Sequence, residues 1–252
     1  MASFYRSIIV ILILTTLCFG QTRPIEFNDF FEMGRVTEPQ ISPDGKYVVY
    51  TVTVYSIEKN KGNSDIHLVS TEGKEQRQLT FSEKRDHAPQ WSPDGESVAF
   101  ISNRDGSSQI YTIPLSGGEA EKITEITTEV KSFTWSPDGN YFMVATDMHP
   151  DAASPAESKK MDEEKEKDPA NARIIDGLLY RHWNEWREGK YSRVLVVPVE
   201  GGEAVSITPP KDDTPPISLG SDHDFVWAAN SSNICYVRNP DPMVAISTNN
   251  DL

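Results

Sequence analysis

A four-residue turn sequence, Ser-Pro-Asp-Gly, occurs three times and constrains the fold more than any other feature of the chain. The copies are 42–45, 92–95 and 136–139, at intervals of 50 and 44 residues, and tryptophan precedes the second and third, at Trp91 and Trp135. Proline presets φ at the second position of a tight turn, glycine suits the fourth, and serine and aspartate bond local amides. The chain is therefore built from repeated units.

The sequence that follows each turn repeats as well. After the second turn, residues 98–102 are Val-Ala-Phe-Ile-Ser, a turn lies at 103–106, and residues 109–115 are Gln-Ile-Tyr-Thr-Ile-Pro-Leu. A Ser-Gly-Gly turn then leads to Glu-Lys-Ile-Thr at 121–124. Alternating β-branched and aromatic residues predict strands. The matching strands are expected at 47–54, 66–70 and 78–80, and at 141–146, 194–199 and 206–208, each unit having one more strand before its turn.

Four short antiparallel strands in roughly 40 to 50 residues is the repeat of a β-propeller blade. The sequence therefore predicts an all-β fold, a β-propeller of four-stranded antiparallel blades that is incomplete, with about three blades plus part of a fourth. The fourth unit starts near Asp224, places Trp227 at the aromatic position and has Asn-Ser-Ser-Asn at its turn, 230–233. A β-sandwich also has short strands, but it has no reason to repeat one turn with one preceding tryptophan.

About 40 additional residues separate the two inner strands of the third unit, which predicts an insertion at about 148–190. Its first part, 157–168, holds four lysines and six acidic residues, so a solvated loop or a short exposed helix is expected. Its second part, 176–190, alternates aromatic and charged residues. A long hairpin that turns at 188–190 is favoured there, and a helix with apolar residues at Ile175, Leu179, Trp183 and Trp186 is the alternative.

The first twenty residues have the layout of a secretory signal peptide. Arg6 precedes an apolar run at 8–14, and Cys18 and Gly20 lie at positions −3 and −1 of a cleavage site before Gln21. We therefore expect a signal peptide at 1–20, a partial propeller at 21–252, and a secreted or periplasmic protein without membrane attachment after cleavage. A membrane anchor is the alternative, although it needs about 20 apolar residues. A lipoprotein is less favoured, because Thr15-Thr16-Leu17 before Cys18 lacks small residues.

Composition excludes several classes of protein. With 24 basic and 38 acidic residues the net charge is −14, the wrong sign for binding phosphate backbones, so no nucleic-acid partner is expected. A hydrophobic content of 37% excludes a bilayer-embedded bundle, and 5 Trp, 9 Tyr and 10 Phe argue against disorder. Cleavage after residue 20 would leave Cys235 as the one cysteine, which excludes a disulfide scaffold.

These motifs resemble those of a known peptidase family. Residues 24–52 are similar to the first part of the propeller in secreted serine peptidases of the prolyl oligopeptidase family, in the dipeptidyl peptidase and acylaminoacyl peptidase branch. Residues 88–95 and 102–106 match a blade signature shared with TolB-like propellers, and residues 180–186 resemble the peptidase branch more. The resemblance implies a seven- or eight-bladed propeller that caps a C-terminal α/β-hydrolase domain.

In that family the catalytic serine, aspartate and histidine belong to the hydrolase domain. No Gly-x-Ser-x-Gly nucleophile sequence occurs in the 252 residues, so no catalytic residue is assigned and the hydrolase domain is expected to be absent. The chain is interpreted as a fragment that is inactive alone. No cofactor is expected. The five histidines are not spaced as metal ligands, and Asp44, Asp94 and Asp138 lie in turns, so no metal site is expected either.

The insertion supplies the candidate site. Propeller carboxylates in the resembled family hold the positive amino terminus of the substrate, and here Glu185 and Glu188 lie beside Trp183 and Trp186. We expect the glutamates to act as charge partners and the indoles as apolar walls for peptide substrates. In the alternative interpretation the aromatics only pack the insertion onto the third blade. The sequence Asp222-His223-Asp224 is interpreted as a polar loop.

The function expected from the resemblance is the substrate-gating propeller of a secreted serine peptidase that cleaves peptides from the N-terminus. The alternatives are a stand-alone TolB-like propeller that acts as a non-catalytic protein-binding module, and a truncated product with no activity of its own. An incomplete ring leaves an unpaired strand edge and exposed apolar surface between blades. The isolated chain is therefore expected to oligomerise or aggregate.

Overall fold

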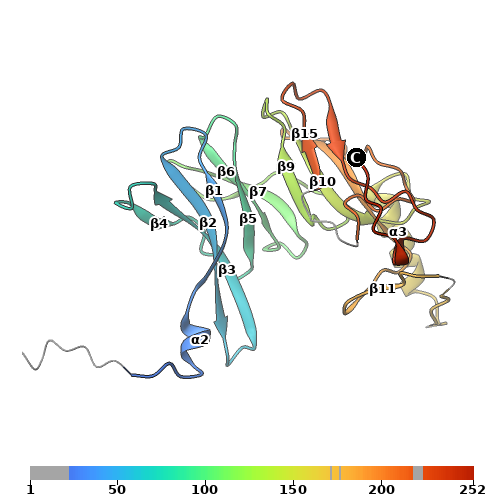
Figure 1. The fold of residues 1–252 in the computed structure, drawn as a ribbon, viewed down its shortest axis with the longest axis horizontal. Helices are drawn as coiled ribbons and strands as arrows, with labels where there is room; N and C mark the ends of the chain where they lie inside the picture. Colours follow the sequence, from blue (N-terminus) through green and yellow to red (C-terminus); the bar gives the residue numbers. More distant parts are fainter. Residues whose placement is uncertain (1–22, 171, 176, 218–223) are drawn as a thin grey trace, which may run out of the picture.

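A computed structural model describes residues 23–170, 172–175, 177–217 and 224–252. The predicted signal peptide at 1–20 and residues 222 and 223 lie outside this range. Within it the strands form three four-stranded antiparallel sheets and two two-stranded sheets. The four-stranded sheets and one of the two-stranded sheets are arranged as neighbouring blades (Figure 1). The all-β propeller expected from the repeat is confirmed, with three complete blades and two strands of a fourth.

The four strands of each blade run outward in chain order. Blade one follows the short helix α2 (Asp29–Glu32) and consists of β1 (Arg35–Ile41), β2 (Tyr47–Ser56), β3 (Lys61–Ser70) and β4 (Gln76–Gln78). Blade two consists of β5 (Asp86–Trp91), β6 (Ser97–Ser102), β7 (Gln109–Pro114) and β8 (Glu121–Lys122). Blade three consists of β9 (Ser132–Trp135), β10 (Tyr141–Met148), β13 (Tyr191–Pro198) and β14 (Val205–Ser206).

The remaining elements belong to the insertion and to the fourth blade. The insertion holds α3 (Pro155–Glu166) and the small hairpin β11 (Arg181–His182) and β12 (Glu185–Trp186). The fourth blade holds β15 (Phe225–Trp227) and β16 (Ile234–Tyr236), and the 3-10 helix η1 (Val244–Ile246) follows. Among the described residues, neither α-helix has the length and apolar composition needed to cross a bilayer.

The repeated turn forms in the same way in all three blades. The serine hydroxyl donates to the aspartate carboxylate, at 2.7 Å for Ser42 and Asp44 and at 2.5 Å in the other two copies. The glycine that follows has φ of 74° to 76° in each copy, a left-handed conformation that favours glycine. The three turns therefore connect the first two strands of successive blades in one geometry.

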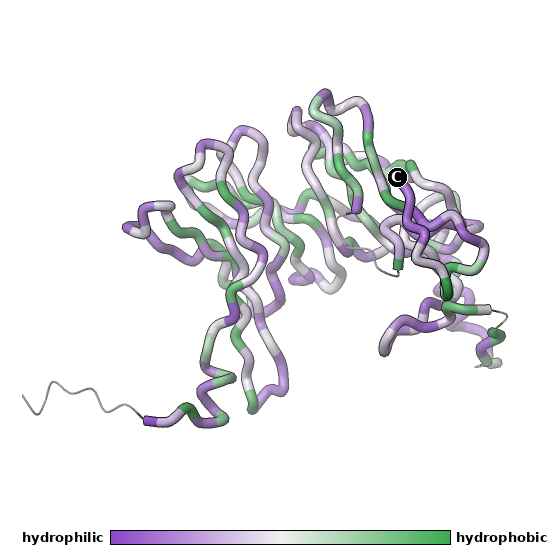
Figure 2. Tube along the Cα trace, viewed as in Figure 1, coloured by the Kyte–Doolittle hydropathy of each residue, from purple (hydrophilic) through white to green (hydrophobic). Residues whose placement is uncertain are grey.

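The apolar core lies between the blades, because alternate residues of a strand face opposite neighbours. In β6, Val98 and Phe100 pack toward blade one, whereas Ala99 and Ile101 pack toward blade three. Strand β10 repeats this division with Phe142 and Val144 on one side and Met143 and Ala145 on the other. Figure 2 shows hydrophobic stretches along the strands and hydrophilic turns.

Candidate functional site

The chain enters and leaves the insertion at one rung of the β-ladder of blade three. It leaves β10 at Met148 and returns to β13 at Tyr191, and these two residues are partners in the antiparallel ladder. Helix α3 begins at Pro155. Ser154 caps its first turn by accepting a hydrogen bond from the backbone N–H of Glu157 at 3.2 Å, and proline is favourable at this first helical position. The charged segment is thus a helix, and Met161 packs it against the core between blades two and three.

The aromatic segment is extended and not helical. Strands β11 and β12 pair His182 with Glu185 and Arg181 with Trp186, so the helical alternative is wrong. The expected turn at 188–190 is present and leads to β13. The hairpin of β11 and β12 itself turns earlier, at Trp183 and Asn184, where Trp183 has φ of 49°. The two indoles differ in exposure: Trp183 is 84% exposed and Trp186 is 45% exposed.

Trp186 is packed at the base of the hairpin. Its ring lies 5.9 Å from that of Tyr180, and the guanidinium of Arg173 lies 4.4 Å from its ring centroid, which is a cation–π contact. Trp183, in contrast, is at the tip and is 84% exposed. Trp186 thus forms a wall, whereas Trp183 is available for contact with another molecule.

Glu188 is held by two cations. It pairs with Lys165 of α3 and accepts from Nε of Arg173 at 2.8 Å. The hydrogen bond from Lys165, which has the larger effect, and the one from Arg173 lower the pKa of Glu188 below its ordinary value. The carboxylate therefore joins the hairpin to α3, and its charge is already balanced.

A second carboxylate joins the same two elements. Asp162 of α3 binds Nε2 of His149 at 3.0 Å and Nζ of Lys190 at 2.7 Å. Burial acts to raise the pKa of Asp162, but the hydrogen bonds from Lys190 and His149 outweigh it, so the pKa is lowered. The contacts that fix the hairpin base to α3 are thus mainly electrostatic.

A third ion pair fixes the other side of the hairpin. Arg187 pairs with Asp213, whose carboxylate also accepts the backbone N–H of Ser192 at 2.9 Å. Both side chains of the pair are largely buried. Sequence reasoning missed Asp213, although one signal was present: the link 207–224 that contains it is longer than the links at 79–85 and 123–131.

Two clefts are both lined by Trp186 and Arg187, and they also share Lys131 and Asp147, which form an ion pair. We name them the Glu185 cleft and the Glu188 cleft. The Glu185 cleft, of about 290 Å³, is also lined by Ser132, Ala145, His182, Glu185, Ser192, Asp213, Pro215, Pro216 and Ile217. The Glu188 cleft, of about 320 Å³, is also lined by Thr127, Thr128, Glu129, Lys159, Asp162, Glu188 and Lys190.

The charge balance distinguishes Glu185 from its neighbours. Three carboxylates line the Glu185 cleft, and two of them, Asp147 and Asp213, are paired with cations. Glu185 is exposed and forms no ion pair within the described part of the chain. The structure thus brings Glu185 and Trp186 together at one cleft, places Glu188 at the other in an ion pair, and leaves Trp183 at the exposed tip.

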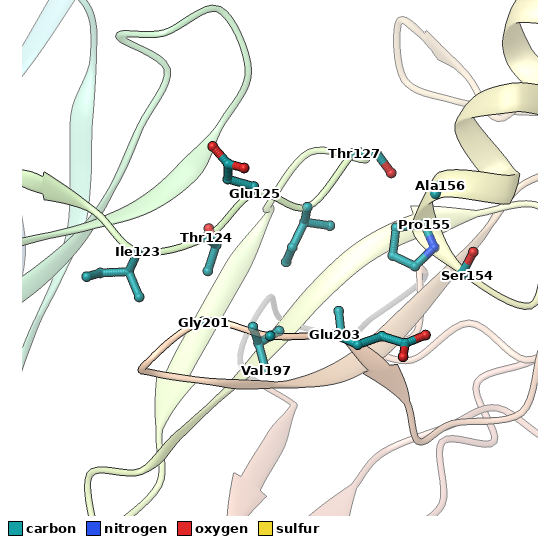
Figure 3. A pocket seen from close by; sticks show the side chains of 13 residues that line it. Ile123, Thr124, Glu125, Thr127, Ser154, Pro155, Ala156, Val197, Gly201 and Glu203 are labelled. Atoms are coloured by element: carbon teal, nitrogen blue, oxygen red, sulfur yellow. The ribbon is translucent and has the colours of Figure 1, made fainter.

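A separate hollow of about 410 Å³ lies between blades two and three, beside the first turn of α3 (Figure 3). Ile123, Val197 and Pro155 lie around it, and Glu125 and Glu203 belong to its lining. Glu125 interacts with Lys122 at 3.6 Å. This hollow marks the seam where α3 meets the blades. Among the described residues, no group of three or more His, Cys, Asp and Glu is arranged to hold a metal ion.

Curated relatives of the chain are named as peptidases. Dipeptidyl-peptidase 5 of Porphyromonas gingivalis is 33% identical over 232 residues, which are 88% of this chain and 32% of that protein. The uncharacterized peptidase YuxL of Bacillus subtilis is 32% identical over 192 residues, 75% of this chain and 28% of that protein. The chain therefore spans about a third of the length of these relatives.

Solved structures support the same fold. The acylaminoacyl peptidase of Pyrococcus horikoshii matches with a TM-score of 0.56 and 19% identity, covering 73% of this chain and 26% of that one. The AtxE2 isopeptidase matches with a TM-score of 0.54 and 15% identity, covering 75% of this chain and 33% of that one. A family profile described as the TolB beta propeller domain matches residues 20–167, more than half of the chain. By its blades, its repeated turns and this match, the chain belongs to the TolB β-propeller domain family.

Proposed function

We propose that this chain is the propeller part of a secreted serine peptidase that removes dipeptides from the amino terminus of peptides. Support comes from the sequence similarity to dipeptidyl-peptidase 5 along 88% of the chain. The propeller admits and orients the peptide, while a hydrolase domain outside these residues supplies the acyl-transfer chemistry.

The observation that carries the proposal is the unpaired carboxylate of Glu185. In the Glu185 cleft the other two carboxylates already have cationic partners, so a positive group that enters the cleft meets Glu185. A peptide's protonated amino terminus is such a group. Trp186, Pro215 and Pro216 supply apolar surface for the adjoining part of the peptide. Trp183 at the exposed tip extends this surface, and Glu188 holds the hairpin in place through its two ion pairs.

The test uses the complete polypeptide that contains this propeller and compares dipeptidyl-coumarin substrates with free and acetylated amino termini. Glu185→Gln keeps the size of the side chain and removes its charge, so kcat/KM for the free-amine substrate should fall about 10- to 100-fold, the value of one charge-assisted hydrogen bond. Hydrolysis of the acetylated substrate should not change. Glu203→Gln, at the hollow between blades two and three, is the matched control.

Unchanged kcat/KM in Glu185→Gln would remove Glu185 from the site. If the complete polypeptide hydrolyses no peptide and has no nucleophilic serine that reacts with a fluorophosphonate, the peptidase proposal itself fails. A non-catalytic propeller that binds a partner protein then becomes the better description.

A further inference from the structure

The Glu185 cleft is bordered by two segments that are distant in sequence. The hairpin supplies residues 182 and 185–187, and the link that follows blade three supplies Asp213 and residues 215–217. The other lining residues lie in or beside the strands of blade three. The width of the cleft therefore depends on how the hairpin and the link are held relative to each other.

The link is attached to blade three through its backbone. The N–H of Thr214 donates to the carbonyl of Ser192 in β13 at 2.8 Å, and the hydroxyl of Ser192 donates to the carbonyl of Thr214 at 3.2 Å. The N–H of Ser192 donates to Asp213 at 2.9 Å. Residues 213–216 are buried, and the rings of Pro215 and Pro216 restrict their own backbone. The link thus forms a wall of the cleft whose position is set by β13.

One side chain joins the hairpin to this wall. Nη2 of Arg187 pairs with Asp213 and also donates to the carbonyl of Lys190 at 2.8 Å. The two side chains of the pair are 15% and 5% exposed, so salt screens their attraction little. Among the described residues, no other hydrogen bond or ion pair joins the hairpin at 177–190 to the link at 209–217.

The aspartate beside Asp213 has a different partner. Asp212 pairs at 2.6 Å with Arg238, which follows β16 of the fourth blade. Neither of these two residues lines the Glu185 cleft. Of the two consecutive carboxylates in the link, Asp213 is therefore the one that bears on the cleft, and Asp212 offers a matched comparison.

The Glu185 cleft is small. Its volume of about 290 Å³ lies at the lower end of small-molecule pockets, which measure roughly 300 to 1,000 Å³. One methylene group more or less in an apolar pocket changes kcat/KM by roughly 10- to 200-fold. A cleft of this size with walls held at a fixed separation discriminates among entering side chains by their bulk.

We propose that the ion pair of Arg187 and Asp213 sets the width of the Glu185 cleft and thereby selects peptides by the size of their amino-terminal residue. A short apolar side chain such as valine fits between Trp186 and the prolines, whereas tryptophan does not. Because their charges balance each other, Arg187 and Asp213 position the walls and leave the amine of the peptide to Glu185. The inference rests on the proposed function, since it takes this cleft as the site of the peptide's amino terminus.

The experiment uses the complete polypeptide and two dipeptidyl-coumarins with free amino termini, valyl-alanyl and tryptophyl-alanyl. The double variant Arg187→Met with Asp213→Asn removes both charges, so no buried charge is left unpaired, and the asparagine oxygen still accepts from Ser192. KM for the valyl substrate should rise at least about 10-fold with kcat little changed, because the pair acts on binding. The ratio of kcat/KM for the valyl over the tryptophyl substrate should fall at least about 10-fold.

Two further variants separate positioning from general loosening of the fold. Arg238→Met with Asp212→Asn removes the same charges at the neighbouring position of the link and should leave KM and the ratio unchanged. Arg187→Lys keeps the charge of the pair, and its ratio should lie closer to that of the unaltered protein than to that of the double variant. Should the double variant not fold, Asp213→Asn alone carries the test, with a fall in the ratio expected.

An unchanged ratio in the folded variant, an equal fall in the Asp212 control, or a loss in kcat at constant KM overturns the inference. Equal cleavage of the two substrates by the unaltered protein does so as well. Failure of the proposed function looks different, because Glu185→Gln then leaves hydrolysis of the free-amine substrate unchanged. If Glu185→Gln lowers that hydrolysis while the double variant keeps the preference for valine, the inference alone is wrong.

Discussion

Glu38 of blade one accepts the backbone N–H of Ala88 of blade two at 2.9 Å, and both residues have positive φ, of 56° and 53°. Each precedes a Pro-Gln pair and lies in a bulge of the innermost strand, where the register of the ladder shifts. The same Glu38 oxygen accepts from Oγ1 of Thr51 at 2.6 Å. The left-handed conformation of Ala88 is thus held by a hydrogen bond across the boundary between blades.

Glu38→Ala should lower the free energy of unfolding by about 1–3 kcal/mol, because it removes the acceptor for Ala88 and Thr51. Glu38→Gln retains an oxygen acceptor and should stay within about 1 kcal/mol of the unaltered chain. Urea unfolding of the two variants makes the comparison. Equal destabilisation by alanine and glutamine would show that the charge matters and not the hydrogen bonds.

Phe142→Ala should destabilise the chain by about 3–5 kcal/mol, because Phe142 is fully buried between blades two and three against Phe133 and Trp135. Val205→Ala, on the exposed outer strand of the same blade, should cost less than about 1 kcal/mol. Chemical denaturation measures both. A similar loss in the two variants would contradict a core placed between the blades.

The attachment of the β11–β12 hairpin to α3 should weaken in acid. The pKa of Glu188 is lowered by Lys165 and Arg173, so its contribution is complete above the ordinary value of 4.5 and is lost as the pH falls through the lower value of the folded state. Hydrogen exchange of residues 177–190, corrected for the intrinsic rate, should accelerate in that range. Glu188→Gln should exchange fast at every pH, whereas Glu185→Gln should follow the unaltered chain.

The isolated chain should self-associate. Strand β1 is exposed along its length, and Val36 and Ile41 on it are 63% and 67% exposed. Such an edge pairs or packs with another molecule. Size-exclusion chromatography with light scattering should show oligomers, and Val36→Lys with Ile41→Lys should shift them toward monomer. A monomeric unaltered chain that unfolds in a single sharp transition would contradict this prediction.

The blades were predictable from sequence because their turns are local. Ser92, Asp94 and Gly95 satisfy one another within four residues, and the strands beside them alternate by a period of two. The insertion was predictable only in outline. Its hairpin is too short for a periodic pattern, and its position depends on pairs distant in sequence, such as Arg187 with Asp213 and Lys190 with Asp162.

The candidate site was also predictable only in part, because it too depends on pairs that are distant in sequence. Residue types at 183–188 indicate charge and aromatic surface, but whether a carboxylate is paired depends on partners elsewhere in the chain. Glu188 meets Lys165 and Arg173, and Glu185 meets no cation in the described residues. Sequence alone treats the two glutamates alike. The roles assigned to the four predicted residues remain proposals.

The pairing of Met148 with Tyr191 has a consequence for how this protein can diversify. Because both ends of the insertion meet at one rung of the ladder, the segment between them can change in length without shifting the register of blade three. The hairpin that carries Glu185 thus adds no strand to the sheet of blade three. Recognition at this position can therefore change by replacement of the hairpin at 177–190, while Ala152 and Met161 keep their packing between blades two and three.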